Sequence, residues 1–377
     1  MNRTDTIYKL LRPIGKLIVD CKFKYNYTVN KPMDEPYIVL SNHVTDFDPI
    51  LVGLAFQKPM RFVASEHVAR WGFLYKLLKF CFDPILRYKG ALATTTIREM
   101  FSSIKKGQNV CIFAEGIRSW DGLSSPILPS TGKMVKSARC GMVTYHLSGG
   151  YFASPGWSES TRRGEINGAV VSVYTKEEMA KMTAEEINDI IVRDLYEDAY
   201  ERQLAAPKKY KSKKRAEGLE NLLFLCPVCG GIDTIHTYRN NAECSACEHL
   251  FTYNEYGMLE GTSQSTVREL AAWQRNTLSE LAWQDGFLLS VPEAVLQTVT
   301  NHEEQILAKG QASLNKEALT CGDVIIPLAD IVDMALHGRR NLVFSTADNY
   351  YELRPAAGLN GLKLLWLYEE YKAAATQ

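Results

Sequence analysis

The sequence predicts an α/β protein with two smaller C-terminal parts, a cysteine-rich unit and a mainly-β domain closed by a helix. Three observations support this prediction. Short apolar runs alternate with helical patterns between residues 37 and 206, which is typical of a sheet flanked by helices. Two CxxC pairs follow within residues 226–247. Beyond residue 304, several short strand-like runs precede one amphipathic helix.

The composition is that of a globular protein with two or three domains. The chain has 377 residues, of which 46% are hydrophobic and 23% are charged. Its 43 basic and 43 acidic side chains cancel, which argues against a function in coating nucleic acid. No stretch reaches about 18 consecutive apolar residues, and the N-terminus lacks the apolar region and cleavage site of a secretory signal. We therefore expect a cytoplasmic protein without a transmembrane helix.

Residues 1–25 are expected to form an amphipathic N-terminal helix. Apolar residues recur there at helical spacing, namely Ile7, Leu10, Leu11, Ile14, Leu17 and Ile18. The segment also carries six basic and two acidic side chains, a net charge of +4. Such a helix can lie on an anionic membrane surface and hold the protein peripherally on the inner face of the membrane. Alternatively, it covers part of the core and its basic residues are simply solvated.

The α/β pattern itself spans residues 26–206. We expect strands at 37–40, 61–64, 85–88 and 110–113, and helices at 49–56, 71–80 and 94–106. A further helix is expected after Thr183, because Glu185 and Glu186 lie in its first turn.

A basic linker is expected at 207–218, since 208–215 holds six charged groups among eight residues. A solvated linker is the simplest interpretation, and docking to anionic lipid, a polyanionic cofactor or nucleic acid are alternatives. The cysteine-rich unit follows at 219–262, and the last part is 263–377. That part is expected to contain a helix at 265–284, short strands at 306–308, 318–321, 324–328, 331–336, 342–345 and 350–353, and a helix at 361–371. Strands closed by one helix are similar to a pleckstrin-homology-like (PH-like) or GRAM-like domain.

His43 and Asp48 lie on either side of a polar turn that follows the first predicted strand. Across such a bend the two side chains can converge, and a histidine held by a carboxylate is prepared as a general base near neutral pH. The alternative is that Asp48, which precedes Pro49, is only a helix-start signal.

A second polar group, Glu115, Gly116 and Arg118, follows the predicted strand 110–113. Ligands bind at strand ends in open α/β sheets, where a glycine allows close approach of the backbone and an arginine suits phosphate. Arg87, at the end of another strand, would add positive charge to the same edge. Alternatively, Glu115 and Arg118 form an ordinary surface ion pair, and Arg87 is solvated on an edge strand.

Taken in order, these segments resemble the motifs of the glycerolipid acyltransferase family, which includes the lysophosphatidate and glycerol-3-phosphate acyltransferases. Residues 42–48 (NHVTDFD) match the first motif, 85–87 (ILR) match the arginine motif, and 113–119 (FAEGIRS) match the third. The resemblance covers roughly residues 10–205. Ala114 stands where the family usually has proline, and 141–145 lacks the proline of the fourth motif. These departures put the identity of the acceptor in doubt more than the chemistry.

The resemblance implies a glycerolipid-acyltransferase-like sheet and a matching mechanism. His43 would take the proton of an acceptor hydroxyl, and Asp48 would orient its ring. The residues expected to bind the acceptor are Asn42, Arg87, Glu115, Gly116 and Arg118. The acceptor would be a lysophospholipid, most simply 1-acyl-sn-glycerol 3-phosphate, which would give phosphatidate. The acyl donor would be acyl-coenzyme A or acyl carrier protein.

The cysteines predict a metal site. Cys226 and Cys229 are followed after 14 residues by Cys244 and Cys247, which is the layout of a four-thiolate zinc site. The segment between them is strand-like and resembles a zinc ribbon. A closed four-sulfur site is structural, because catalytic zinc keeps an open position. The total of nine cysteines is odd, which favours a metal and buried thiols in a reducing compartment over a disulfide framework. The alternative is four thiols without metal.

Three functions remain open at this point. The first is an active lysophospholipid acyltransferase with accessory domains, and the intact His43 and Asp48 favour it. The second is a non-enzymatic lipid- or nucleic-acid-binding protein with a degenerate acyltransferase domain. The third is an acyl-thioester hydrolase, in which water replaces the acceptor.

Overall fold

The computed structural model describes residues 3–87, 93–300, 303–356 and 359–375, so Tyr88, at the end of a predicted strand, lies outside the described residues. The chain divides into two compact units. Unit 1 comprises Met1–Gly156 and Thr161–Lys211, and unit 2 comprises Trp157–Ser160 and Ser212–Gln377. Within the described ranges, no helix has the length and apolar character needed to cross a membrane.

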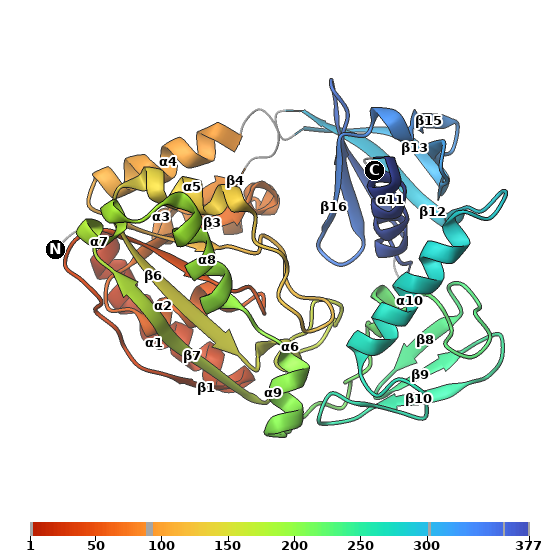
Figure 1. Cartoon of the computed structure of the whole chain (residues 1–377), viewed down its shortest axis with the longest axis horizontal. Coiled ribbons are helices and arrows are strands. Elements are labelled where there is room, and N and C mark those ends of the chain that lie inside the picture. Colours follow the sequence, from red (N-terminus) through yellow and green to blue (C-terminus); the bar gives the residue numbers. More distant parts are fainter. Residues whose placement is uncertain (1–2, 88–92, 301–302, 357–358, 376–377) are drawn as a thin grey trace. The chain divides into compact units, whose positions relative to one another are not determined.

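Unit 1 is built on a seven-stranded mixed sheet, which confirms the predicted α/β class (Figure 1). The strand order is β1-β7-β6-β2-β5-β3-β4, and only the β6–β7 pair is antiparallel within this sheet. The strands are β1 (Lys24–Tyr27), β2 (Tyr37–Ser41), β3 (Met60–Ser65), β4 (Ile85–Arg87), β5 (Asn109–Phe113), β6 (Gly141–Ser148) and β7 (Glu165–Tyr174). The four strands expected in this part correspond to β2, β3, β4 and β5. The sequence did not predict β1, β6 or β7 as strands, and β1 and β7 are partly exposed.

Helices cover both faces of this sheet. They are α1 (Arg3–Lys22), α2 (Asp48–Ala55), α3 (Phe73–Phe82), α4 (Ala93–Lys105), α5 (Pro129–Ala138), α6 (Gly150–Ala153), α7 (Lys176–Lys181), α8 (Ala184–Leu195) and α9 (Ala199–Ala205). The helix expected after Thr183 is α8, and Thr183 and Glu186 form a capping box at its start. Pro13 lies inside α1 and does not end it. The core on one face joins β2, β5 and β6 to α4, α5 and α8 through residues such as Ile38, Met100, Val135, Met142 and Ile187.

The parallel register brings the carboxyl ends of three strands to one edge. Ser41 of β2 pairs with Phe113 of β5 on one side and with Tyr145 of β6 on the other. The loops that leave β2 and β5 therefore start side by side and contain the polar motifs found in the sequence, while β6 continues beside them to Ser148.

The segment expected as a solvated linker is partly anchored to unit 1. Tyr210 is buried, its ring packs on Phe152, and its hydroxyl donates to the Glu165 carbonyl at 3.0 Å. Lys211 exchanges two backbone hydrogen bonds with Arg163, both of 2.9 Å.

Unit 2 contains a small antiparallel sheet of β8 (Ile235–Tyr238), β9 (Asn241–Cys244), β10 (Leu250–Tyr253) and β11 (Leu259–Glu260), followed by α10 (Val267–Ala282). A second antiparallel sheet contains β12 (Leu289–Thr300), β13 (Glu303–Leu314), β14 (Ala318–Cys321), β15 (Val324–Pro327), β16 (Asp333–His337), β17 (Asn341–Ser345) and β18 (Tyr350–Pro355). Helix α11 (Leu362–Ala375) ends this part, so the expected mainly-β domain with a closing helix is present. The sequence did not predict β12, which contains Pro292 and a register shift between Val291 and Ala294.

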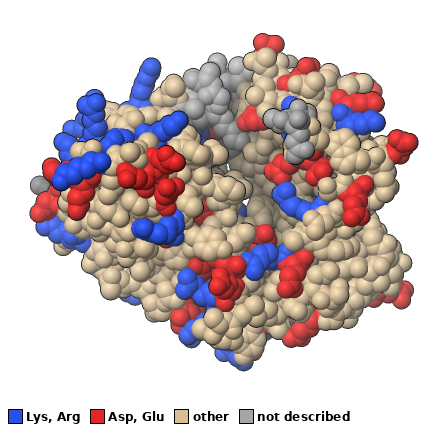
Figure 2. Space-filling view, in the orientation of Figure 1, with Lys and Arg blue, Asp and Glu red and all other residues tan. Residues whose placement is uncertain are grey.

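Basic and acidic side chains are interspersed over the face drawn in Figure 2, in keeping with the zero net charge.

Two helical glycines should respond in opposite ways to alanine. A Cβ on Gly132 of α5 would lie 2.2 Å from the carbonyl oxygen of Ala184 and 2.7 Å from Cβ of Asn188, so α5 and α8 would have to separate. We expect Gly132→Ala to lower the free energy of unfolding by about 1–3 kcal/mol. A Cβ on Gly53 of α2 meets no atom within 4 Å, so Gly53→Ala should raise that free energy by up to about 1 kcal/mol. Urea unfolding of both variants is the measurement, and an equal response would contradict the packing described for α5.

Candidate functional site

His43 and Asp48 meet across the bend between β2 and α2. Nδ1 of His43 lies 2.7 Å from Oδ2 of Asp48. Asp48 is not the N-cap of α2 but its first residue, and its carboxylate also accepts from the N–H groups of Val44 at 2.7 Å and Thr45 at 3.0 Å. The hydroxyl of Thr45 donates to Oδ1 at 2.7 Å. The carboxylate, which is fully buried, therefore fixes the bend and orients the imidazole at the same time.

The ring of His43 is also held by an aromatic neighbour. It stacks on Phe113, the last residue of β5, with ring centroids 4.7 Å apart, and Phe113 in turn stacks on Phe62. About a quarter of the His43 side chain, 23%, remains exposed. Because Nδ1 faces a carboxylate, it carries the proton, which leaves Nε2 with the lone pair that a general base needs.

Glu115 joins two loops of the site. Its Oε1 accepts from the backbone N–H of His43 at 3.0 Å, and its Oε2 accepts from the N–H of Ser125 at 2.7 Å. Burial raises the pKa of the Glu115 carboxyl to about 7; the two backbone donors oppose this shift, and the nearby charges of Asp48 and Glu197 add to it.

Gly116 leaves room for the side chain of Arg87. Gly116 has a φ of +73°, and a Cβ there would lie 2.9 Å from an Nη atom of Arg87. Arg87, exposed at the end of β4, donates to the Gly116 carbonyl at 3.3 Å. The cation that the sequence placed on another strand thus reaches the loop after β5.

The guanidinium group of Arg118 is bonded to other groups of the protein. Its guanidinium donates to the carbonyls of Ser154 and Pro155, both at 2.9 Å, and pairs with Asp46 at 2.5 Å. Only 11% of its side chain is exposed. Glu115 and Arg118 therefore bind separate partners, and do not form the surface ion pair that we considered as an alternative. Between Arg118 and Arg87, Arg87 is the more accessible cation.

Asn42 is fully buried and faces β6. Its amide group donates to the carbonyl of Leu147 at 2.7 Å and accepts from the N–H of Leu147 at 2.8 Å. This geometry makes Asn42 a brace between two loops at the sheet edge, and its contact with the acceptor stays a prediction.

Sequence reasoning missed several partners of the site. Asp46 was inside a quoted motif, but nothing in its spacing indicated Arg118 as its partner. Ser125 comes from a distant loop and gave no signal, and the sequence assigned no role to segment 145–157, which contains Ser154 and Pro155. Next to them, the buried Glu197 lies 3.1 Å from Nε2 of His146 and accepts from Arg202 at 2.9 and 3.0 Å.

The four predicted cysteines of unit 2 form one cluster that could hold a metal ion. Their sulfur atoms all lie within 4.8 Å of one another. The Sγ–Sγ distance is 3.7 Å for Cys226–Cys247 and also for Cys229–Cys244. A tetrahedral zinc ion about 2.3 Å from each sulfur keeps the sulfurs about 3.8 Å apart, so these positions fit such an ion.

The same local turn follows each CxxC pair. Gly230 and Glu248 both have positive φ, and each donates its N–H back to the first cysteine of its pair, Cys226 or Cys244. The backbone thereby directs both pairs of sulfurs to one point.

Metal removal should destabilise the cysteine unit. We expect about one equivalent of zinc per chain by elemental analysis, and chelation should expose residues 226–260 to limited proteolysis. Cys244→Ser should lose the metal, while Cys21→Ser, at an exposed cysteine outside the cluster, should retain it. A chain that contains no metal and resists proteolysis equally with and without chelator would contradict this prediction.

The raised pKa of Glu115 predicts a pH dependence of stability. In the unfolded chain this carboxyl ionises near 4.5, whereas in the folded protein it ionises near 7. As the pH rises from 4.5 to 7, the unfolded chain releases the proton first, so the free energy of unfolding falls by roughly 3 kcal/mol over that window. Below 4.5 and above 7 this contribution is constant. Urea unfolding across this range is the measurement.

In Glu115→Gln the decline assigned to this carboxyl should vanish, whereas Glu177→Gln, at an exposed carboxyl of α7, should keep it. Equal pH profiles for wild type and Glu115→Gln would show that the carboxyl does not titrate in this range.

Comparison with known proteins gives one matching family. Residues 22–148 match the family described as Acyltransferase. Among solved structures, the 1-acyl-sn-glycerophosphate acyltransferase PlsC of Thermotoga maritima is similar over 53% of this chain and 80% of that chain, with 18% identity and a TM-score of 0.45. The N-terminal PH domain of human ARAP2 is similar over 24% of this chain and 85% of that chain, with 13% identity and a TM-score of 0.20. No curated protein matches the chain. The acyltransferase family model thus matches the part of the chain that contains His43, Asp48, Glu115 and Arg118.

Proposed function

We propose that this protein transfers a fatty acyl group from an acyl thioester to the hydroxyl of a lysophospholipid, most simply 1-acyl-sn-glycerol 3-phosphate to give phosphatidate. The observation that supports this most strongly is the 2.7 Å contact between His43 and the buried Asp48 at the carboxyl edge of the sheet. The loop that contains Glu115 and Gly116 is tied directly to His43, and Arg87 adds a cation there.

The proposed reaction begins at Nε2 of His43, because Nδ1 faces Asp48. Nε2 of His43 takes the proton from the acceptor hydroxyl as its oxygen attacks the thioester carbonyl carbon. Asp48 stays ionised and stabilises the imidazolium that forms. The tetrahedral intermediate then collapses, the carbon–sulfur bond breaks, and the proton on Nε2 passes to the leaving thiolate. The products are an ester and a free thiol, and no acyl-enzyme is needed.

Two arginines take different roles in this proposal. Arg87, which is exposed, contacts the phosphate of the acceptor, because a guanidinium suits phosphate oxygens in geometry and charge. Arg118, whose donors go to Asp46 and to the carbonyls of Ser154 and Pro155, holds the surrounding loops in place.

The remaining ligands follow from the same chemistry. Acyl-coenzyme A and acyl carrier protein present the same pantetheine thioester, so both are proposed donors. A zinc ion in the four-cysteine site would have a structural role, since four thiolates leave it no open position. Because lysophospholipids reside in membranes, we place the protein peripherally on the inner face of the membrane.

Substitution of His43 and of Asp48 tests this function. We expect His43→Ala to lower kcat by about 10²–10⁴-fold, since it removes the base. Asp48→Asn should also lower kcat, because an amide cannot balance the imidazolium charge. The assay crosses acyl-coenzyme A and acyl carrier protein donors with lysophosphatidate, glycerol 3-phosphate and other lysolipids. His236→Ala, at an exposed histidine of β8, is the matched control and should behave as wild type.

Each other outcome has a definite meaning. Full turnover by His43→Ala would remove it as the base. Release of free fatty acid without an ester product would identify a thioester hydrolase. A wild-type protein that binds lipid and transfers nothing would identify a binding protein.

A further inference from the structure

Helix α3 is apolar, yet it has no fully buried side chain. Seven of its ten residues are Phe, Leu or Cys, yet none of the ten, all within the described part of the chain, is buried. Phe73 is 81% exposed and Phe80 is 56% exposed, with Leu74 and Leu77 close to half exposed. At about 100° per residue, these four side chains share an arc of about 120° on one face of the helix. Such a face is costly to leave in water.

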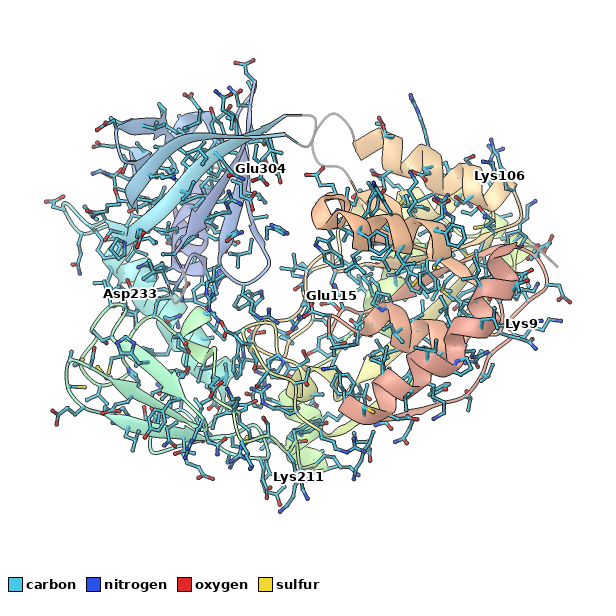
Figure 3. All side chains as sticks on the ribbon, turned by 180° about the vertical axis from the view of Figure 1, so that it is seen from behind. Lys9, Lys106, Glu115, Lys211, Asp233 and Glu304 are labelled. Carbon is cyan, nitrogen blue, oxygen red and sulfur yellow. The ribbon has the colours of Figure 1, made fainter. Side chains whose placement is uncertain are left out.

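Helix α1 has an apolar face of the same kind. Tyr8 and Val19 are buried against unit 1, but Leu10 and Leu17 are 68% and 65% exposed, and Ile14 and Ile18 are also exposed. These four exposed residues lie within an arc of about 100°. Helices α1 and α3 contact each other and lie side by side in the view from behind, where Lys9 of α1 is labelled (Figure 3). We call the eight exposed residues of the two helices, together with Trp71 just before α3, the apolar surface.

The charges next to the apolar surface are basic. Helix α3 contains Lys76 and Lys79 and no acidic residue, and both lysines are exposed. Asp83, at its C-terminal end, is paired with Arg61 at 2.8 Å. On α1, Asp20 is paired with Lys16 at 2.5 Å. These two acidic groups are thus paired. Lys76 lies about 40° from the edge of the apolar arc, where its long side chain can reach anionic headgroups, whereas Lys79 points away from the arc.

From these observations we infer that α3 and α1 together dock on a bilayer that contains anionic lipids. Their apolar faces enter the boundary between headgroups and acyl chains, and Lys76 contacts the headgroups. The sequence predicted such a role for residues 1–25 alone, whereas the structure adds α3, which follows β3 of the sheet that carries the site. The consequence for turnover rests on the proposed function, but the docking itself does not.

A lipid surface explains the apolar surface better than a second copy of the chain. In a symmetric dimer over this face, the same lysines would approach each other from both chains. Anionic headgroups instead neutralise them, and a bilayer accepts a broad, convex pair of helices without a complementary groove.

Vesicle binding by the full chain tests this inference. The probe is sedimentation with vesicles of phosphatidylcholine alone or mixed with phosphatidylglycerol. The combined variant Phe73→Ser, Leu77→Ser and Phe80→Ser should lose at least about tenfold in partitioning onto the mixed vesicles. It should keep wild-type thermal stability, since it removes no buried side chain. Lys76→Gln should reduce the preference for anionic vesicles by about fivefold, and Lys79→Gln, on the other side of α3, should reduce it less.

The matched control replaces three exposed apolar residues elsewhere on unit 1: Leu128→Ser, Val192→Ser and Leu204→Ser. It should bind vesicles as wild type does. His43→Ala should also bind normally, so a failure of docking is distinguishable from a failure of the proposed chemistry. With the α3 variant, turnover of a water-soluble short-chain acceptor should persist, and turnover of an acceptor embedded in vesicles should fall.

Two outcomes would overturn the inference. One is unchanged vesicle binding by the α3 variant. The other is a wild-type dimer in lipid-free solution, measured by analytical ultracentrifugation, that the α3 variant converts to a monomer.

Discussion

The contact between the His43 imidazole and the Asp48 carboxylate is the constraint on which the site depends. Asp48 also accepts from the backbone of Val44 and from the backbone and hydroxyl of Thr45, so it closes the bend between β2 and α2. A buried charge at the start of a helix is tolerated because N–H groups and the helix dipole surround it. The interaction that shapes the backbone is thus the one that selects the tautomer of the imidazole.

The rest of the site is arranged around this bend by the register of the parallel strands. Because Ser41 and Phe113 are paired neighbours and both strands end there, the loops that follow them meet, beside the end of β6. Glu115 binds the backbone of His43, and Asn42 binds the backbone of Leu147. Most polar groups of the motifs therefore hold the loops in position, and few are free to contact a substrate.

Different means stabilise the two units. Unit 1 has a large apolar core between its sheet and helices, and it also exposes apolar residues on α1 and α3 that a bilayer would cover. The small sheet of unit 2 has short strands of two to four residues, and a metal ion held by the four converging cysteines would crosslink it.

The sequence by itself determined the features that depend on local spacing. The buried runs of β2 and β5, the order of the acyltransferase motifs and the two CxxC pairs could all be identified, because burial on both faces and turn chemistry leave continuous patterns. Only the tertiary structure decided which side chains the motif residues contact. Arg118 meets Asp46, Ser154 and Pro155, and Glu115 meets Ser125, because strand register and loop paths bring distant residues together. The exposure of α3 likewise could not be predicted, since an apolar helix has the same sequence pattern whether protein or lipid covers it.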